Sequence, residues 1–149
     1  MIGAKMVSVN AFYQMSSKLE KTIKSSMDDI TDDLLRVATE RAPVKSKTLE
    51  QSGAKISPKK SGNAYVSQVS FKAKKKGFNY AVKMDSGTYK LGDKSLQKSK
   101  RGVRSVFTNQ TLKVGKGYLT DTAEKCEAGY KKYISEQLAD EIRRQGFSK

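Results

Sequence analysis

Apolar side chains recur at helical spacing in the first part of the chain. Between residues 10 and 42 they follow one another at steps of three or four residues: Phe12, Met15, Leu19, Ile23, Met27, Ile30, Leu34 and Val37. This spacing predicts one long helix, with Asn10 or Ser8 as its N-cap and with its end set by Pro43. A helix of about 45 Å is longer than a small domain needs, and the stripe approaches heptad spacing. The stripe therefore packs either inside the domain or on a neighbouring subunit.

The segment 49–85 has the two-residue period of strands. One face of its clearest strand carries Tyr65, Ser67, Val69, Phe71 and Ala73, and the other carries Val66, Gln68, Ser70 and Lys72. A weaker strand near 52–57 and a third strand at 80–85 complete the pattern, with turns at 57–63 and 74–77. We expect an antiparallel β-meander of about three strands.

Residues 86–117 are less regular, and five glycines interrupt them. Val103, Ser105 and Phe107 alternate with more polar neighbours, so the pattern leaves open a short strand or hairpin inside this basic loop. A loop of this length in a compact domain is usually functional or disordered.

The segment 120–145 returns to helical spacing. Its apolar face contains Leu119, Ala123, Cys126, Tyr130, Tyr133, Ile134, Leu138 and Ile142. Asp121 and Glu124 resemble a capping box, Gly146 is placed as the C-terminal cap, and Arg143 and Arg144 suit the last turn. The order of elements predicts a single α+β domain over 1–149, with the C-terminal helix packed on the sheet.

Charge is distributed unevenly between these elements. Residues 1–44 and 118–149 each carry six Lys/Arg and six Asp/Glu, whereas residues 45–117 carry eighteen cations and three acids, Glu50, Asp85 and Asp93. The difference, 18 − 3 = +15, equals the formal net charge of the whole chain. Such a concentration of charge indicates a surface for an anionic ligand or an acidic partner.

The residue content argues against several function classes. The chain has no histidine, which excludes the common zinc sites and the Ser-His-Asp and Cys-His catalytic arrangements. Asp28, Asp29, Asp32 and Asp33 lie on one side of the first helix, but other acids that a two-metal site would need are not evident, so we interpret them as a solvated or interface-facing acidic surface. Cys126 is expected to be a buried, unreactive thiol. Phosphate-binding glycine motifs are not recognisable. We therefore expect no catalysis and no cofactor.

Targeting features are also not expected. A run of about 18 apolar residues is missing, so the sequence predicts no transmembrane span. The first residues contain no apolar core of a signal peptide, and the single cysteine suits a reducing compartment.

The basic centre mixes cations with aromatic residues. Its cations are Lys72, Lys74, Lys75, Lys76, Lys94, Lys98, Lys100, Arg101 and Arg104, and its aromatics are Phe71, Phe78, Tyr80, Tyr89 and Phe107. Cations with aromatics are typical of nucleic-acid surfaces. The alternative interpretation is that the lysines only maintain solubility and protect strand edges.

Three segments together resemble the tailed-bacteriophage head–tail joining proteins, also called tail-completion or minor capsid proteins. Ala42-Pro43-Val44, followed by Leu49 and Ser52, is similar to the family's APV-x-TG-x-L-x-x-S junction after a long helix. The segment from Tyr80 to Thr88, with Gly87, is similar to YA-x-x-x-E-x-GT. The segment from Gly117 to Ala123, with Leu119, resembles PFL-x-PA. The resemblance spans residues from about 10 to 145.

This chain departs from the family pattern at several positions. Ser46 and Lys47 replace Thr-Gly, Asp85 replaces Glu, and Thr122 replaces Pro. The basic loop is also longer than the family's usual link.

The resemblance implies a non-enzymatic virion protein. It implies a ring, most often a hexamer, in the neck between the head connector and the tail tube, with assembly in the host cytoplasm. Neighbouring connector and tail-tube proteins are the implied partners. A tail-terminator or neck-adaptor ring is a closely related alternative for the function. The alternative is a basic nucleic-acid-binding protein.

Lys94, Lys98, Lys100, Arg101 and Arg104 are the candidate partner-facing residues. They contact either DNA in the channel, without reading its sequence, or an acidic neighbouring ring.

Overall fold

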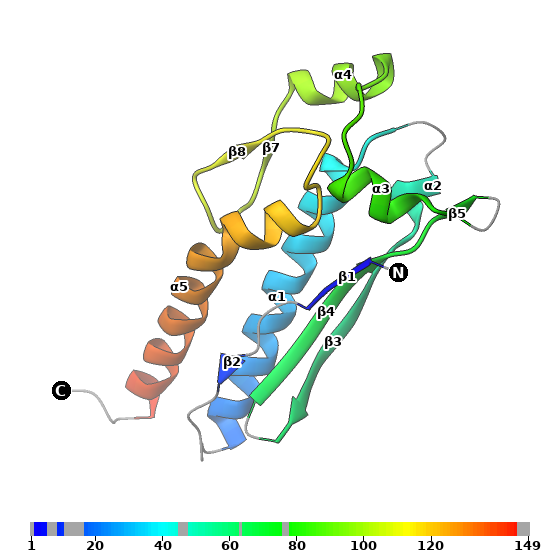
Figure 1. The fold of residues 1–149 in the computed structure, drawn as a ribbon. Coiled ribbons are helices and arrows are strands. Elements are labelled where there is room, and N and C mark those ends of the chain that lie inside the picture. Colours follow the sequence, from blue (N-terminus) through cyan, green and yellow to red (C-terminus); the bar gives the residue numbers. More distant parts are fainter. Residues whose placement is uncertain are drawn as a thin grey trace.

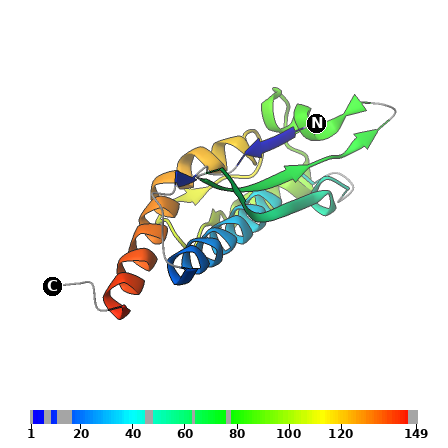
Figure 2. The ribbon, with the colours of Figure 1, turned by 90° about the horizontal axis from the view of Figure 1, so that it is seen from below.

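The computed structural model describes residues 2–5, 9–10, 17–44, 48–62, 64–75 and 78–145. Two long helices, α1 (Ser17–Arg41) and α5 (Thr120–Arg144), and a small antiparallel sheet form the body of the protein. α1 is central, because it contacts both α5 and the strands of the sheet (Figures 1 and 2). The expected α+β class is confirmed.

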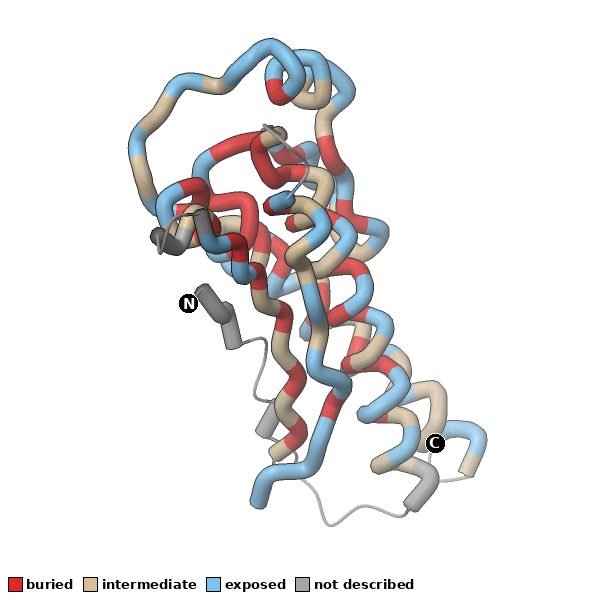
Figure 3. Tube along the Cα trace, turned by 90° about the vertical axis from the view of Figure 1, so that its right-hand side faces the viewer, coloured by how far each residue is buried: buried red, intermediate tan, exposed pale blue. Residues whose placement is uncertain are grey.

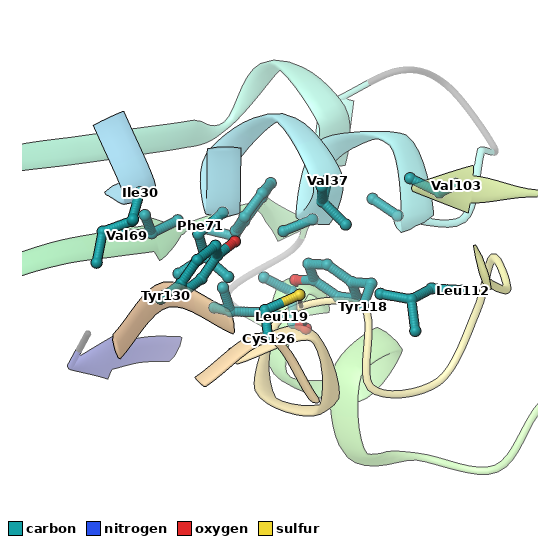
Figure 4. Close-up of a cluster of buried hydrophobic side chains, with 14 of the residues drawn as sticks. Ile30, Val37, Val69, Phe71, Val103, Leu112, Tyr118, Leu119, Cys126 and Tyr130 are labelled. Atoms are coloured by element: carbon teal, nitrogen blue, oxygen red, sulfur yellow. Dashed lines mark hydrogen bonds between the residues drawn. The ribbon is translucent and has the colours of Figure 1, made fainter. Parts of the chain in front are cut away.

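The apolar stripe of α1 faces the inside of the domain. Ile23, Met27, Ile30, Leu34 and Val37 have no exposed surface. They join β4 and α5 residues in one hydrophobic core, part of which is drawn in Figure 4. Over the described helix, the intradomain alternative is therefore the one observed, while Phe12 and Met15 lie outside the described residues.

The sheet is built around β4 (Ala64–Phe71). β3 (Gly53–Ser61) pairs along one edge of β4, and two short strands, β1 (Ile2–Lys5) and β2 (Val9–Asn10), pair in succession along the other edge. The predicted alternation is confirmed: Tyr65, Ser67, Val69 and Phe71 are buried, and the residues between them are partly exposed (Figure 3).

Two predictions for the first half of the chain were wrong. Asn10 pairs with Ala64 in the sheet, so it is no helix N-cap. β3 also extends to Ser61, through most of the turn expected at 57–63. Its pairing register shifts between Ile56 and Lys59, which leaves Ser57 and Pro58 opposite one residue of β4. A proline has no N–H to donate to a ladder, and a bulge removes the need for that donor.

The third strand of the predicted meander is a helix. Residues 80–85 belong to α3 (Tyr80–Ser86), which follows the two-residue strands β5 (Lys74–Lys75) and β6 (Phe78–Asn79). The buried residues of α3 are Ala81, Met84 and Asp85. These buried residues follow one another at steps of three and one, as on one face of a helix. In so short a segment, the alternation of Tyr80, Val82 and Met84 does not distinguish the two-residue period of a strand from the 3.6-residue period of a helix.

The basic loop has more structure than expected. It contains α4 (Asp93–Lys100) and the hairpin of β7 (Val103–Arg104) with β8 (Thr111–Leu112). The hairpin alternative is therefore the one found, while α4 was not anticipated. α4 stands at the end of the molecule, beyond the last turn of α1 (Figure 1). No described helix is both long and apolar enough to cross a membrane.

Candidate functional site

The three family-like segments meet at one place, where α1 ends, α3 lies and α5 begins. The central contact is the carboxylate of Asp85, which is 4% exposed. Its Oδ1 accepts the backbone N–H of Leu119 at 2.9 Å and of Thr120 at 3.2 Å, and its Oδ2 accepts the Thr120 hydroxyl at 2.8 Å. Asp85 thus caps α5 from a distance of 34 residues in the chain.

This cap replaces the predicted capping box. α5 begins after Leu119, without a side-chain cap from its own first turn. Asp121 pairs with Arg41 at 3.0 Å and with Lys125 at 3.2 Å instead. The box was wrong because α5 already begins at Thr120, which puts Asp121 inside the first turn and not at the N-cap position. Gly146 lies outside the described residues.

Arg41 ties the end of α1 to the start of α5, although the sequence analysis did not single it out. It is 3% exposed, and its guanidinium donates to the Lys113 carbonyl at 2.7 Å and to the Thr122 hydroxyl at 2.7 Å. The same residue's carbonyl accepts the Gly115 N–H at 2.9 Å. A single arginine in a last helical turn is common, so the sequence offers no signal that separates this role from a solvated one.

Two glycines, at the end of α3 and just before α5, are required because other atoms lie very close to the place where a side chain would begin. A Cβ on Gly87 would lie 2.5 Å from the Lys83 carbonyl oxygen, where the chain leaves α3. Gly117 has a φ of +79°, and a Cβ there would lie 2.5 Å from Cβ of Asp121. Both positions favour the residue that has no side chain.

The other family-like residues also serve the fold. Ala42, Leu49 and Leu119 are buried in the core, and Ser52 donates its hydroxyl to the Leu49 carbonyl at 2.8 Å. The remaining positions of this set are Pro43, which is buried, Val44, Tyr80 and Ala123, which are partly exposed, and Thr88, which is exposed. Together these contacts form the joint between the helices and the sheet.

The cations of the predicted partner surface divide into two groups. Lys94, Lys100, Arg101 and Arg104 are exposed. Lys98 is different, because its ammonium donates to the carbonyls of Thr39 and Ala42, each at 3.0 Å. These carbonyls lie at the end of α1, where intrahelical donors are missing, so Lys98 caps that helix. Unlike the other four cations, Lys98 is therefore directed into the fold, with its side chain 14% exposed.

The environment of Lys98 lowers the pKa of its ammonium group. Burial lowers the pKa of the ammonium, and Glu50, whose carboxylate oxygen lies 3.5 Å away, opposes part of that change. α4 has a second polar contact with the end of α1, because the Ser95 hydroxyl accepts the Val44 N–H at 2.8 Å. These two side chains hold α4 in place.

The aromatic residues of the basic centre mostly belong to the core. Phe71 is fully buried, with its ring centroid 5.1 Å from that of Tyr118 in an edge-on arrangement. Phe107 packs on Tyr130 and Tyr133, with ring centroids 5.8 and 4.5 Å apart. Tyr80 and Tyr89 pack on the core as partly buried residues. The side chain of Phe78 lies outside the described part. Residues turned inward in this way are not available as a stacking platform for bases.

Of the four aspartates of α1, Asp29 and Asp32 are exposed and Asp28 is partly exposed, as a solvated acidic surface requires, whereas Asp33 departs from this interpretation. Asp33 is buried, and its carboxylate accepts the Ser105 hydroxyl at 2.6 Å and the Tyr130 hydroxyl at 2.7 Å. Asp28 and Asp32 both pair with Lys55, and Asp29 accepts the Tyr133 hydroxyl. Within the described ranges, no group of three or more His, Cys, Asp or Glu residues is arranged to hold a metal ion.

Cys126 is buried, as predicted. Burial raises the pKa of its thiol, which keeps the reactive thiolate scarce at neutral pH.

Comparisons of this chain with protein-family models, with curated proteins and with solved structures found no match.

Proposed function

We propose that this chain is a non-enzymatic structural protein of a tailed-phage virion, forming a ring in the neck that joins the head connector to the tail tube. The observation that carries the proposal is the joint described above. Three segments that resemble the head–tail joining family in sequence order lie together in one core. Asp85 of the second segment bonds to Leu119 and Thr120 of the third, and Arg41, next to the first segment, bonds to Thr122 of the third.

The roles of these residues support the resemblance. Ala42 and Leu119 fill the core, Gly87 permits a close backbone approach, and Asp85 satisfies amides at a helix start. Residues with such roles are what a shared fold requires. Asp85 stands where the family has Glu, and a carboxylate of either length is an acceptor suited to this site.

The chemistry of the described side chains suits a structural role. The two most buried carboxylates, Asp33 and Asp85, are each engaged by several donors within the fold. A general acid or base must instead reach a substrate. The strongest charge lies on the surface, where it suits the recognition of another macromolecule.

We further propose that the ring contains six copies, following the resemblance. In a closed ring each subunit presents two different surfaces that meet each other. The neighbours above and below are then connector and tail-tube proteins, and the chain is assembled into the particle in the host cytoplasm.

The test is the location and copy number of this chain in purified particles. Quantitative mass spectrometry against the major tube protein is expected to give about one ring per particle, and antibody labelling is expected to mark the neck. Loss of the gene is expected to give full heads and free tails. A chain recovered with cellular nucleic acid, and missing from particles, would contradict the proposal and favour the nucleic-acid-binding alternative.

A further inference from the structure

α4 presents two chemically different faces. Ser95 and Lys98 point to the end of α1, where they contact Val44, Thr39 and Ala42. The other sides of the helix carry Asp93, Lys94, Leu96, Gln97, Lys100 and Arg101, all of them exposed. Leu96 and Lys100 are four residues apart, so they lie side by side on the helix, as do Gln97 and Arg101. We call this set the α4 outer face.

The α4 outer face combines an apolar side chain with cations. Leu96 is 48% exposed, and it is one of three large hydrophobic residues exposed to this degree on the described surface. No salt bridge within the described ranges involves Lys94, Lys100 or Arg101, whereas Lys98 on the inner face pairs with Glu50. With three cations and one acid, Asp93, the outer face has a net charge of 3 − 1 = +2 beside an exposed apolar side chain.

A second copy of this chain offers few acidic side chains without a bond in the described part. Most acidic side chains of the described part already bond to cations or hydroxyl groups of their own chain. Examples are the pairs Glu20 and Lys60, Asp29 and Tyr133, and Glu127 and Lys131. Asp93 and Glu124 are exposed acids without such a bond, and they belong to different helices. We therefore expect the complementary acidic surface on another protein.

We propose that the α4 outer face docks on a different protein, at an acidic surface that surrounds an apolar pocket for Leu96. The inference rests on the proposed neck function, which places neighbouring structural proteins next to this chain. Opposite charges accelerate and orient such an encounter, and the buried apolar anchor slows its dissociation.

A protein partner fits these residues better than DNA does. Contacts to a DNA backbone need cations alone, and single strands also need exposed aromatic rings for stacking. Here Phe71, Tyr89 and Phe107 are packed on the core, while the residue among the cations is an aliphatic Leu96. The bonds of Ser95 and Lys98 also hold the helix in a defined position, which docking against a shaped surface requires.

The direct test is zero-length cross-linking of intact particles with a carbodiimide, which joins an amine to a carboxylate in contact with it. We expect Lys94 or Lys100 to be linked to Asp or Glu of another virion protein. Lys59 and Lys72 are the matched controls, because they are exposed lysines of the same basic centre on the sheet side. Links at the α4 lysines should exceed those at the controls at least tenfold.

Each outcome of this test has a defined meaning. Equal linkage of all four lysines overturns the docking site, because it would show unspecific attraction to the net charge. Links only to acids of a second copy, or none at α4, also overturn it, as does recovery of the α4 peptide on DNA after photochemical cross-linking. Particles that contain the chain without such links refute this inference alone. Particles that lack the chain refute the proposed function and the inference with it.

A pair of variants tests the apolar anchor. Leu96→Asp replaces the exposed apolar side chain of the α4 outer face by a negative charge, and it should lower the yield of joined particles at least tenfold. Ile56→Asp is the control, since Ile56 on β3 is 46% exposed, nearly the same as Leu96. It should leave the yield within about twofold. Circular dichroism of both proteins shows whether they fold. A normal yield from folded Leu96→Asp protein would overturn the anchor.

Discussion

Asp85 is the residue on which the joint between α3 and α5 depends most, and its removal has a calculable cost. In Asp85→Ala, the N–H groups of Leu119 and Thr120 lose their acceptor. Leu119 is fully buried, so water does not replace the carboxylate at its amide. A buried donor left unpaired costs about 1–3 kcal/mol, and the lost negative charge at a helix start costs about 0.3–1 kcal/mol more. We expect a total of about 2–4 kcal/mol, since water can reach Thr120.

Asp85→Asn separates the two contributions. The amide oxygen still accepts the backbone N–H groups, whereas the charge and the best acceptor for the Thr120 hydroxyl are lost. We expect a loss of about 1 kcal/mol, which places this variant between the wild type and Asp85→Ala.

The assay is urea unfolding followed by circular dichroism at 222 nm, with thermal unfolding as a second measurement. For a chain of this size, a loss of about 2–4 kcal/mol corresponds to a fall in Tm of roughly 4–16 °C. Glu124→Ala is the control on the same helix, because Glu124 is exposed and a capping box would need it. We expect it to change stability by less than about 0.5 kcal/mol. The reasoning would be refuted if Glu124→Ala were as destabilising as Asp85→Ala, or if Asp85→Ala were as stable as the wild type.

Two further predictions concern the packing of α5. Replacing a helical glycine by alanine usually stabilises a helix by about 1 kcal/mol, but a Cβ on Gly129 would lie 2.6 Å from the Phe107 carbonyl oxygen. Gly129→Ala is therefore expected to lower the Tm, and a rise would disprove this contact. Tyr130→Phe removes a hydrogen bond to the buried carboxylate of Asp33 and should cost about 1.5–3 kcal/mol in urea unfolding, whereas Tyr133→Phe, at a more exposed bond, should cost less than about 1 kcal/mol. Burial, with the nearby negative charge, raises the pKa of Tyr130 above its ordinary value, so the unfolded chain loses this proton first. The free energy of unfolding should then fall as the pH rises above about 10, and the fall should be shallower in Tyr130→Phe; equal slopes would contradict this account.

The helices were predictable because their signal is local. The period of α1 and α5 is repeated over many residues, so single deviations do not hide it, and Pro43 marks an end by its covalent structure alone. The faces of β4 were predictable for the same reason, since eight residues alternate without interruption.

Short elements were not predictable in this way. α3 and α4 have seven and eight residues, too few to establish a period. α4 has a polar sequence and is held by two side chains, Ser95 and Lys98, at the end of a helix some 50 residues earlier. Its stability depends on those tertiary contacts, because an isolated helix of this length is not stable in water.

The sequence by itself determined where the charge lies, which stripes are apolar and where the chain breaks, since these follow from residue identity and short-range spacing. Only the tertiary structure decided what the polar residues do. Asp33 and Asp85 became buried acceptors and Lys98 a helix cap, while Lys94 and Lys100 stayed at the surface. A charged side chain looks the same in sequence whether it is solvated or buried, because its role depends on donors and acceptors that distant segments bring to it.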